Sequence, residues 1–277
     1  MMIYAIFSFF YNTIILMSYH APRKRFGQHF LTNTQVIQHI ISAIAPNTEQ
    51  HLVEIGPGKG ALTLPLLESG CQLDVIELDR DLIQWLDEKA LSFKQLRVHQ
   101  ADVLNFDFKQ FQQPFRVVGN LPYNISTPLL FHLLANASDI IQDMTFMLQK
   151  EVVERMVAVP SSSQYGRLSV MLQYHCQIEK LFDVSPDAFY PPPKVNSSIV
   201  QLIPYAKPPV EVISLKHFAK IVTQAFSQRR KTLRNTLKTV LDIKDIESVG
   251  INPQARAETL TLEEFANLAN KHSELKL

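Results

Sequence analysis

The sequence has few cysteines and no metal-binding pattern. Only two of its 277 residues are cysteines, and Cys71 and Cys176 are too far apart in the chain to form a C-x-x-C pair. The nine histidines show no H-E-x-x-H or similar ligand spacing. We therefore expect reduced thiols, as in a cytoplasmic protein, with no disulfide framework and no structural metal.

An excess of charge is also missing. Lysine and arginine number 27 and aspartate and glutamate 26, which leaves a formal net charge of +1. This balance excludes a chain that binds nucleic acid with its whole surface, so any contact with RNA must rest on a local basic cluster. The sequence has no coiled-coil pattern or extended apolar stripe, and we expect a monomer.

A long apolar run is present only at the start of the chain. Residues 1–17 read MMIYAIFSFFYNTIILM and carry no charge. A secretory signal needs a cationic start, and a membrane span needs about 20 apolar residues without the interruption at residues 11–13. We favour a translation start at Met17, with residues 1–19 as an N-terminal extension, and we expect no stable membrane association.

Short apolar runs rich in β-branched residues then alternate with helical patterns. The expected strands are residues 52–55, 73–77, 97–100, 116–119 and 144–148, and the expected helices are residues 34–44, 61–69, 79–91 and 126–135. This alternation predicts βαβ crossovers and a parallel sheet. Two later runs, residues 178–184 and 198–203, flank three prolines at 191–193 and predict an antiparallel hairpin at the sheet edge, where proline is tolerated.

The pattern changes after residue 203. Residues 204–209 (PYAKPP) are typical of a linker, and the sequence from Lys216 onward indicates helices only. We therefore expect a large α/β domain at residues 20–205 and a small C-terminal helical domain at residues 206–277. The small domain has about seventy residues and needs the large one for support.

Alternating glycines follow the first expected strand. Gly56 opens the stretch GPGKG, whose backbone can approach a ligand closely, although such a loop is sometimes only a tight turn. Glu77 ends the second strand, where a carboxylate can accept hydrogen bonds from both ribose hydroxyls of a nucleoside. Asp102 ends the third and can meet an adenine amino group, whereas Asp79 suits the N-cap of the next helix. Together they predict an adenosine-containing cofactor; a dinucleotide would also satisfy Gly56 and Glu77.

The stretch GNLPYNIS at residues 119–126 follows the fourth expected strand and suits methylation of an adenine amine. The lone pair of this amine is delocalised into the ring, and acceptors aimed at its N–H bonds can localise it. The Asn120 side-chain oxygen and the Leu121 carbonyl are suitable acceptors, and Pro122 restricts Leu121 to extended conformations. Tyr123 offers a flat face for stacking on an unstacked base. The alternative is a strand-to-turn junction with a buried tyrosine.

Further motifs follow one another in the order of one known family. They are RKRFGQHFL (23–31), EIGPG (54–58), VIELD (75–79), NLPYNIS (120–126), MLQKEV (147–152), YGRLS (165–169), FYPPPKV (189–195) and FSQRRK (226–231). The chain resembles the ribosomal RNA adenine N6,N6-dimethyltransferase family over roughly residues 20–270. It is most similar to the bacterial branch that modifies two adjacent adenosines near the 3′ end of small-subunit (16S) ribosomal RNA.

The resemblance implies S-adenosylmethionine as methyl donor, a role in small-subunit biogenesis, and a Rossmann-like methyltransferase sheet with a small C-terminal helical domain. By motif position it implies cofactor contacts from His29, Leu31, Gly56, Glu77, Asp102 and Asn120. It implies catalytic roles for Asn120, Leu121, Tyr123 and Phe189, the last facing the target base opposite Tyr123. His29 stands where the motif often has asparagine; either residue can offer a hydrogen bond, and a local cap is the alternative.

Basic residues gather in the C-terminal part of the chain. Residues 220–238 carry six basic residues and no acidic one, and their spacing predicts a basic stripe on one helical face. Such a stripe suits phosphate contact, although it is often only a solvated face. The expected partner is small-subunit ribosomal RNA in an assembling small subunit. The expected RNA-binding residues are Arg229, Arg230, Lys231, Arg234 and Lys238, with a second patch of Arg23, Lys24 and Arg25.

Three other functions stay open on the sequence alone. A related methylase modifies large-subunit RNA, confers macrolide resistance and shares fold and cofactor. A ribosome assembly factor would act by binding rather than by catalysis, and a DNA adenine methylase would use a similar acceptor motif. The complete NLPYNIS motif and the FSQRRK stretch favour the small-subunit enzyme.

Overall fold

The structure is a computed structural model that describes residues 29–276. The expected extension at residues 1–19, with its start at Met17, and the basic patch of Arg23, Lys24 and Arg25 lie outside the described residues. Within residues 29–276, no helix is long and apolar enough to span a bilayer. Over the same range, no cluster of histidine, cysteine, aspartate or glutamate side chains is arranged to hold a metal ion.

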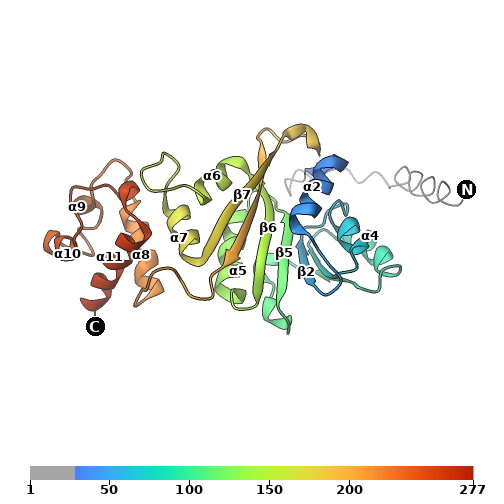
Figure 1. Cartoon of the computed structure of the whole chain (residues 1–277), viewed down its shortest axis with the longest axis horizontal. Coiled ribbons are helices and arrows are strands. Elements are labelled where there is room, and N and C mark those ends of the chain that lie inside the picture. The colour runs from blue at the N-terminus through green and yellow to red at the C-terminus, as the bar shows by residue number, and fades with distance from the viewer. Residues whose placement is uncertain (1–28, 277) are drawn as a thin grey trace, which may run out of the picture.

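A seven-stranded sheet forms the centre of the larger part of the molecule (Figure 1). In spatial order its strands are β4 (Leu96–Gln100), β3 (Gln72–Glu77), β2 (His51–Ile55), β5 (Phe115–Asn120), β6 (Ile141–Gln149), β9 (Ser197–Pro204) and β7 (Cys176–Val184). The first five are parallel, whereas β9 and β7 run antiparallel to their neighbours. The expected parallel sheet with an antiparallel hairpin at its edge is confirmed. A separate short pair, β1 (Phe30–Leu31) with β8 (Phe189–Tyr190), is not apparent from the sequence.

Helices pack against both faces of the sheet. One apolar cluster includes side chains of α2 (Thr34–Ile44), α3 (Thr63–Glu68) and α4 (Arg80–Ala90). The cluster on the opposite face includes side chains of α5 (Ser126–Ala137), α6 (Lys150–Met156), α7 (Arg167–His175) and the 3-10 helices η2 (Val103–Asn105) and η3 (Phe108–Gln110). A further 3-10 helix, η4 (Pro186–Ala188), precedes β8. Because strand side chains alternate between faces, both faces of the parallel strands are buried.

Local capping explains where two of these helices begin. Asn33 precedes α2, and its side chain accepts hydrogen bonds from the backbone N–H groups of Gln35 and Val36. Asp79 precedes α4 and accepts one from Asp81, which confirms the N-cap expected at this position. Both caps satisfy donors that the first turn of a helix leaves free.

The chain after β9 is helical in its described part and lies at one end of the molecule (Figure 1). It contains α8 (Leu215–Ala225), α9 (Leu233–Thr236), α10 (Ile243–Ser248), η5 (Ala257–Thr259) and α11 (Leu262–Glu274). Its core includes Phe218 and Phe265, but also Tyr165 and Tyr174 from the segment around α7. The helical part therefore shares a core with the larger part.

The single basic helix expected across residues 220–238 is wrong. α8 ends at Ala225, turns follow, and α9 spans only Leu233–Thr236. The backbone N–H groups at the start of α9 donate to carbonyls within residues 253–255. This tertiary pairing fixes α9 as a separate short helix, so the basic side chains on either side of the break do not line one helical face.

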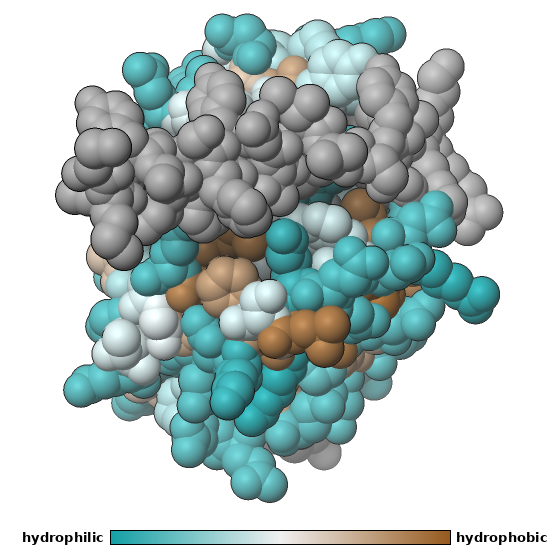
Figure 2. Space-filling model, turned by 90° about the vertical axis from the view of Figure 1, so that its right-hand side faces the viewer, coloured by the Kyte–Doolittle hydropathy of each residue, from teal (hydrophilic) through white to brown (hydrophobic). Residues whose placement is uncertain are grey.

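Phenylalanines are among the largest fully buried side chains, and they occur in both parts of the molecule. Phe108 of η3, Phe115 of β5 and Phe146 of β6 pack together on one face of the sheet, and Phe218 and Phe265 lie among the C-terminal helices. On the face shown in Figure 2, hydrophobic residues reach the surface only in small patches among hydrophilic ones. Most large apolar side chains thus stabilise the core.

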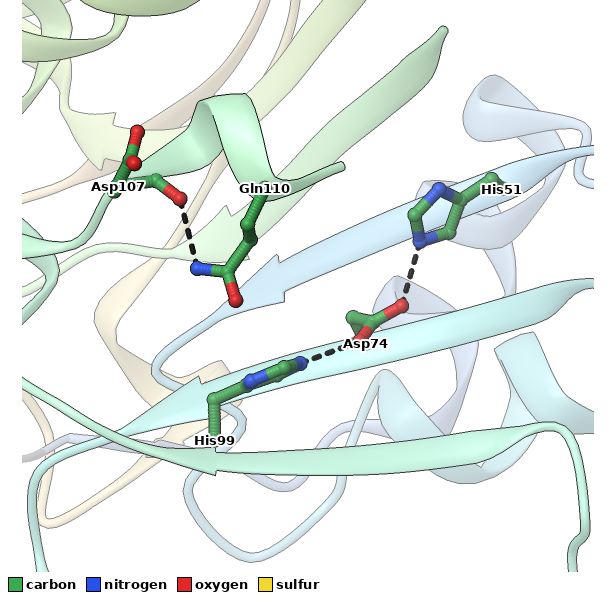
Figure 3. A network of polar contacts seen from close by, with 5 residues as sticks. All are labelled: His51, Asp74, His99, Asp107 and Gln110. Carbon is green, nitrogen blue, oxygen red and sulfur yellow. Dashed lines mark hydrogen bonds and ion pairs between the residues drawn. The ribbon is translucent and has the colours of Figure 1, made fainter. Parts of the chain in front are cut away.

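A buried carboxylate joins side chains of three neighbouring strands of the sheet (Figure 3). Asp74 of β3 is 2% exposed, and its two oxygens lie 2.6 Å from Nε2 of His51 on β2 and 2.5 Å from Nε2 of His99 on β4. A carboxylate only accepts, so both Nε2 atoms carry the donated proton. Burial alone would raise the pKa of Asp74, but the hydrogen bonds and charges of His51 and His99 outweigh it and lower this pKa to about 2.

We expect Asp74→Asn to lower the melting temperature by roughly 4–8 °C at pH 6, because the buried network loses about 2 kcal/mol. The lowered pKa means that the folded state stabilises the ionised carboxyl. This contribution is complete above about pH 4 and is lost as the pH falls towards 2. Thermal unfolding between pH 3 and 7 measures it, with Asp107→Asn at an exposed cap as the control. Equal melting temperatures for Asp74→Asn and the control would contradict a stabilising network.

Candidate functional site at the carboxyl ends of the strands

A cavity lies where the order of the strands reverses. From β2 the chain proceeds outward through β3 and β4, and then continues on the other side of β2 with β5 and β6. Such a switch point leaves a crevice at the carboxyl ends of parallel strands, where ligands bind. A cavity of about 290 Å³ opens there. The segments that line it are residues 29–31, 54–59, 61–62, 76–78, 101–104 and 120–125.

The glycine loop turns at Gly56, whose φ of 65° lies in the left-handed region that favours glycine. A Cβ on Gly56 would lie 4.0 Å from Cδ of Pro122, in the space between this loop and the end of β5. The backbone N–H of Gly56 donates to the Ile76 carbonyl at 3.0 Å and ties the loop to β3. The loop thus offers bare backbone to a ligand.

Glu77 ends β3 and lines the cavity, where it is 9% exposed. Its Oε1 accepts hydrogen bonds from the backbone N–H groups of Leu78 at 2.8 Å and Asp79 at 2.9 Å. Burial raises the pKa of Glu77, and hydrogen bonds from the backbone of Asp79, Leu78 and Gly58 oppose the rise. Oε1 is therefore held in place, and because each carboxylate oxygen has two lone pairs, Oε2 keeps capacity to accept from a ligand even with the contact from Gly58.

Asp102 follows the end of β4 and also lines the cavity. Its exposed carboxylate caps η2: one oxygen accepts from the N–H of Leu104 at 3.0 Å and the other from the Asn105 amide at 2.9 Å. Each oxygen keeps a second lone pair. The expected contact with an adenine amino group stays a prediction.

Asn120 ends β5, and its side-chain amide has a defined orientation. Its Nδ2 donates to the backbone carbonyl of His29 at 3.2 Å. Because a carbonyl only accepts, this contact sets the amide nitrogen towards His29 and the oxygen Oδ1 away from it. No described residue donates to Oδ1, and Asn120 lines the cavity. The amide oxygen is thus available to a donor on a ligand.

His29 connects the cavity to the proline loop. Its Nδ1 lies 2.7 Å from the carbonyl oxygen of Pro191, so Nδ1 carries the proton. The His29 ring is stacked at 6.2 Å from the Tyr123 ring, with 28° between their planes. Since Nδ1 is engaged, the expected hydrogen bond to a cofactor would have to come from Nε2 or from the backbone.

Tyr123 is held at both ends beside the acceptor motif. Its hydroxyl lies 2.9 Å from Oγ of Ser197 at the start of β9, a partner that no motif indicates. Burial raises the pKa of Tyr123, and the hydrogen bond to Ser197 opposes the rise.

Leu31 and Leu121 also line the cavity. The backbone N–H of Leu121 donates to Met147 at 3.2 Å, which sets the direction of the motif after β5.

Phe189 does not lie among the residues that line the cavity. It is 4% exposed, pairs with Leu31 across the short β1–β8 ladder, and packs in an apolar cluster with Val184 and Ile199. Its neighbour Tyr190 is 57% exposed. The expected place of Phe189 opposite Tyr123 therefore stays a prediction, and the geometry of the described residues accounts for Phe189 as part of the core.

The expected RNA-binding side chains of the C-terminal part are exposed. They are Arg229, Arg230, Lys231, Arg234 and Lys238. Arg229 is partly engaged, since it donates to the Ser163 carbonyl at 2.6 Å and pairs with Glu258 at 3.4 Å. These contacts tie the turn after α8 to the loop before α7.

Sequence reasoning misses one buried acid in the cavity wall. Glu54 is 2% exposed on β2 and accepts a hydrogen bond from the Thr63 hydroxyl at 2.6 Å. Burial raises the pKa of Glu54 to about 8; the bond from Thr63 opposes this rise and the charge of Glu77 adds to it. A buried acid with a strongly raised pKa in a cavity is a frequent mark of a functional site. The signal in the sequence is an acid inside an otherwise apolar strand, directly before the glycine loop.

We expect Glu54→Gln to raise the melting temperature of the free protein at pH 8 by roughly 5–10 °C. The folded state keeps a proton that the unfolded chain releases above the ordinary pKa of 4.5, so the stability of the unmodified protein falls as the pH rises from about 5 to 8. Glutamine stays neutral and can still accept from Thr63. The difference in melting temperature between Glu54→Gln and the unmodified protein should shrink towards pH 5, as differential scanning calorimetry can measure. A difference in melting temperature that does not change with pH would refute the explanation by the raised pKa of Glu54. A difference equal to that of the exposed control Glu49→Gln would also refute it.

Comparison with known proteins identifies the family. The sequence model described as Ribosomal RNA adenine dimethylase matches residues 19–274. The chain belongs to the ribosomal RNA adenine dimethylase family. A relative from Pseudomonas aeruginosa, named Ribosomal RNA small subunit methyltransferase A, is 54% identical over 259 residues, which cover 92% of this chain and 96% of the relative. A protein of the same name from Nitrosospira multiformis is 53% identical over 251 residues, covering 91% and 96%.

Solved structures similar to this dimethylase family member have the same architecture. A dimethyladenosine transferase from Plasmodium falciparum superposes with a TM-score of 0.78 at 25% identity, covering 90% of this chain and 99% of the other. The 23S rRNA methyltransferase ErmE superposes with a TM-score of 0.69 at 25% identity, covering 88% and 99%. The expected methyltransferase fold of this dimethylase family member is confirmed.

Proposed function

We propose that the chain uses S-adenosylmethionine to dimethylate N6 of two adjacent adenosines near the 3′ end of small-subunit ribosomal RNA. Family membership and the names of relatives more than 50% identical support this substrate. The observation that carries the proposal is the amide of Asn120, whose nitrogen is tied to His29 and whose oxygen is left for a donor in the cavity. An exocyclic amine is such a donor.

The residues around the cavity fit the proposed cofactor. Glu77 has Oε1 held by backbone N–H groups, and its carboxylate has lone pairs left over to accept from the hydroxyls of a ribose. Gly56 leaves the space that a Cβ would fill, so the chain can pass close to a ligand there. S-adenosylmethionine would supply an electrophilic methyl group on a sulfonium. Residues His29, Leu31, Gly56, Glu77, Asp102 and Asn120 are the proposed contacts.

Asn120 and Leu121 would orient the target amine. Their oxygens accept from its N–H bonds and draw its lone pair out of conjugation with the ring, towards the methyl group. Tyr123, anchored through Ser197, would stack on the base and hold it in plane. Held in this way, the amine would use its lone pair to take the methyl group that the cofactor supplies, and the electron pair of the broken carbon–sulfur bond would leave with the cofactor. The amine would then release one proton, and a second round would use its remaining N–H.

We propose residues 20–205 as the catalytic domain and residues 206–277 as an RNA-binding domain. The exposed Arg230, Lys231, Arg234 and Lys238 support phosphate contact by the helical part. The partner would be ribosomal RNA within an assembling small subunit, with the protein acting as a monomer in the cytoplasm. Arg23, Lys24 and Arg25 would add a basic patch at the N-terminal side.

The test is to incubate the protein with radiolabelled S-adenosylmethionine and unmethylated small ribosomal subunits, and to map the label. Label at N6 of two adjacent adenosines near the 3′ end of the RNA is the expected result. Label elsewhere in the RNA, or label only in a parallel reaction with large subunits, would overturn the substrate and keep the chemistry. Subunit binding without any label would favour an assembly factor over an enzyme.

A further inference from the structure

Lys59 is the only lysine or arginine among the described residues that line the cavity. Its side chain is half-buried, and its Nζ lies 4.8 Å from the centre of the Phe30 ring. Three acids, Glu54, Glu77 and Asp102, line the same cavity. No carboxylate of a described residue lies within ion-pair distance of Lys59. This ammonium is thus held in place by an aromatic ring and has no counter-ion in the described part of the chain.

The proposed cofactor carries charges of both signs, and so does the lining of the cavity. S-adenosylmethionine carries two cationic groups, the sulfonium and the α-ammonium, and one anionic group, the carboxylate of its methionine part. Glu54 keeps its proton up to about pH 8, but ionised carboxylates at Glu77 and Asp102 attract the two cations and repel the carboxylate. Lys59 carries the only ammonium or guanidinium group among the described residues that line the cavity, so it is the group that can offset this repulsion.

The position of Lys59 agrees with where that carboxylate would lie. With the ribose at Glu77 and the methyl group at Asn120, the methionine part extends along the glycine loop towards β1. Lys59 belongs to this loop, and its neighbour Gly58 packs against β1: a Cβ on Gly58 would lie 3.4 Å from two carbons of the Phe30 ring. The loop and β1 thus face each other at this end of the cavity.

We propose that Lys59 binds the carboxylate of the cofactor and makes the site select cofactors that carry this group. The Phe30 ring positions the Lys59 ammonium before the cofactor binds, so the Lys59 side chain loses little conformational freedom on binding. The inference rests on the proposed function, because it names a specificity residue of the same site.

Two cofactors that differ only in the carboxylate test the proposal: S-adenosylmethionine and its decarboxylated form. Isothermal titration calorimetry measures each Kd, and the fluorescence of Trp85, the only tryptophan, which packs on Gly60 of the glycine loop, is a second readout. We expect Lys59→Met to raise the Kd for S-adenosylmethionine roughly tenfold. The Kd for the decarboxylated cofactor should stay unchanged or fall, since a positive charge is removed near a cation. Lys59→Arg should restore most of the selectivity.

The control is Lys94→Met, which removes the same charge outside the cavity and should leave both Kd values unchanged. Unchanged binding of the decarboxylated cofactor also shows that Lys59→Met is folded. Equal weakening of the binding of both cofactors would overturn the role of Lys59 but not the proposed function. Weakened RNA binding with unchanged S-adenosylmethionine binding would do the same. Failure of the unsubstituted protein to bind either cofactor would overturn the proposed function and this inference together.

Discussion

Asn120→Ala should lower kcat for methyl transfer roughly 10²- to 10³-fold, because the variant loses the oxygen that accepts from the target amine as the lone pair localises. The Kd for S-adenosylmethionine should rise far less, since the ribose and adenine contacts stay intact. Single-turnover transfer of labelled methyl groups to small subunits measures the first quantity, and fluorescence titration measures the second.

Asn120→Asp separates an acceptor role from a purely structural one. Aspartate keeps an acceptor oxygen but loses the N–H that donates to the His29 carbonyl. We expect it to retain more activity than alanine and less than asparagine, because its orientation is no longer set by that contact. Asn136→Ala, on α5, removes an amide that bonds only within its own helix and serves as the control. Turnover by Asn120→Ala above a tenth of the unsubstituted rate would contradict the acceptor role.

Glu77→Ala should raise the Kd for S-adenosylmethionine roughly 10²-fold, since two hydrogen bonds from ribose hydroxyls to a charged acceptor are lost. Glu77→Gln keeps an acceptor for the N–H groups of Leu78 and Asp79, so this second change should not destabilise the free protein. Burial raises the pKa of Glu77, so the folded state disfavours the ionised form. Its contribution to stability falls as the pH rises above the ordinary value of 4.5.

A thermal shift assay at pH 8 reads both effects of Glu77 in one experiment. Without cofactor, Glu77→Gln should melt at or above the temperature of the unsubstituted protein. With S-adenosylmethionine present, the unsubstituted protein should gain several degrees by mass action, whereas Glu77→Gln should gain little. Glu88→Gln, an exposed change on α4, controls for loss of charge. An equal gain in both proteins would exclude Glu77 from the cofactor site.

Features that depend on near neighbours in the chain are predictable from the sequence. The N-cap at Asp79 follows from the affinity of a short carboxylate side chain for the free N–H groups of the first helical turn. The left-handed turn at Gly56 follows from the absence of a Cβ. The parallel strands follow from buried runs separated by helical segments, and the carboxyl ends of such strands meet at one edge. The cavity is therefore lined by Gly56, Glu77, Asp102 and Asn120, as the motif spacing indicates.

Features that depend on strand neighbours or on docking of distant segments are not predictable in this way. His51, Asp74 and His99 come together only because β2, β3 and β4 lie side by side in one register. The break between α8 and α9 comes from pairing with residues 253–255, which local helical spacing does not record. Phe189 lies in the core because β8 pairs with β1, whereas its motif position suggests the target base.

The sequence by itself determined the alternation of parallel strands and helices, the helix cap at Asp79, the turn of the glycine loop and the family, because each rests on residue type and short spacing. Tertiary structure alone decided the orientation of the Asn120 amide, the anchor of Tyr123 on Ser197, and the position of Lys59 over Phe30. Each of these contacts joins segments that are remote in the chain. The packing of the sheet, the glycine loop and β1 sets which atoms face each other in these contacts. Residue spacing along the chain does not specify that packing.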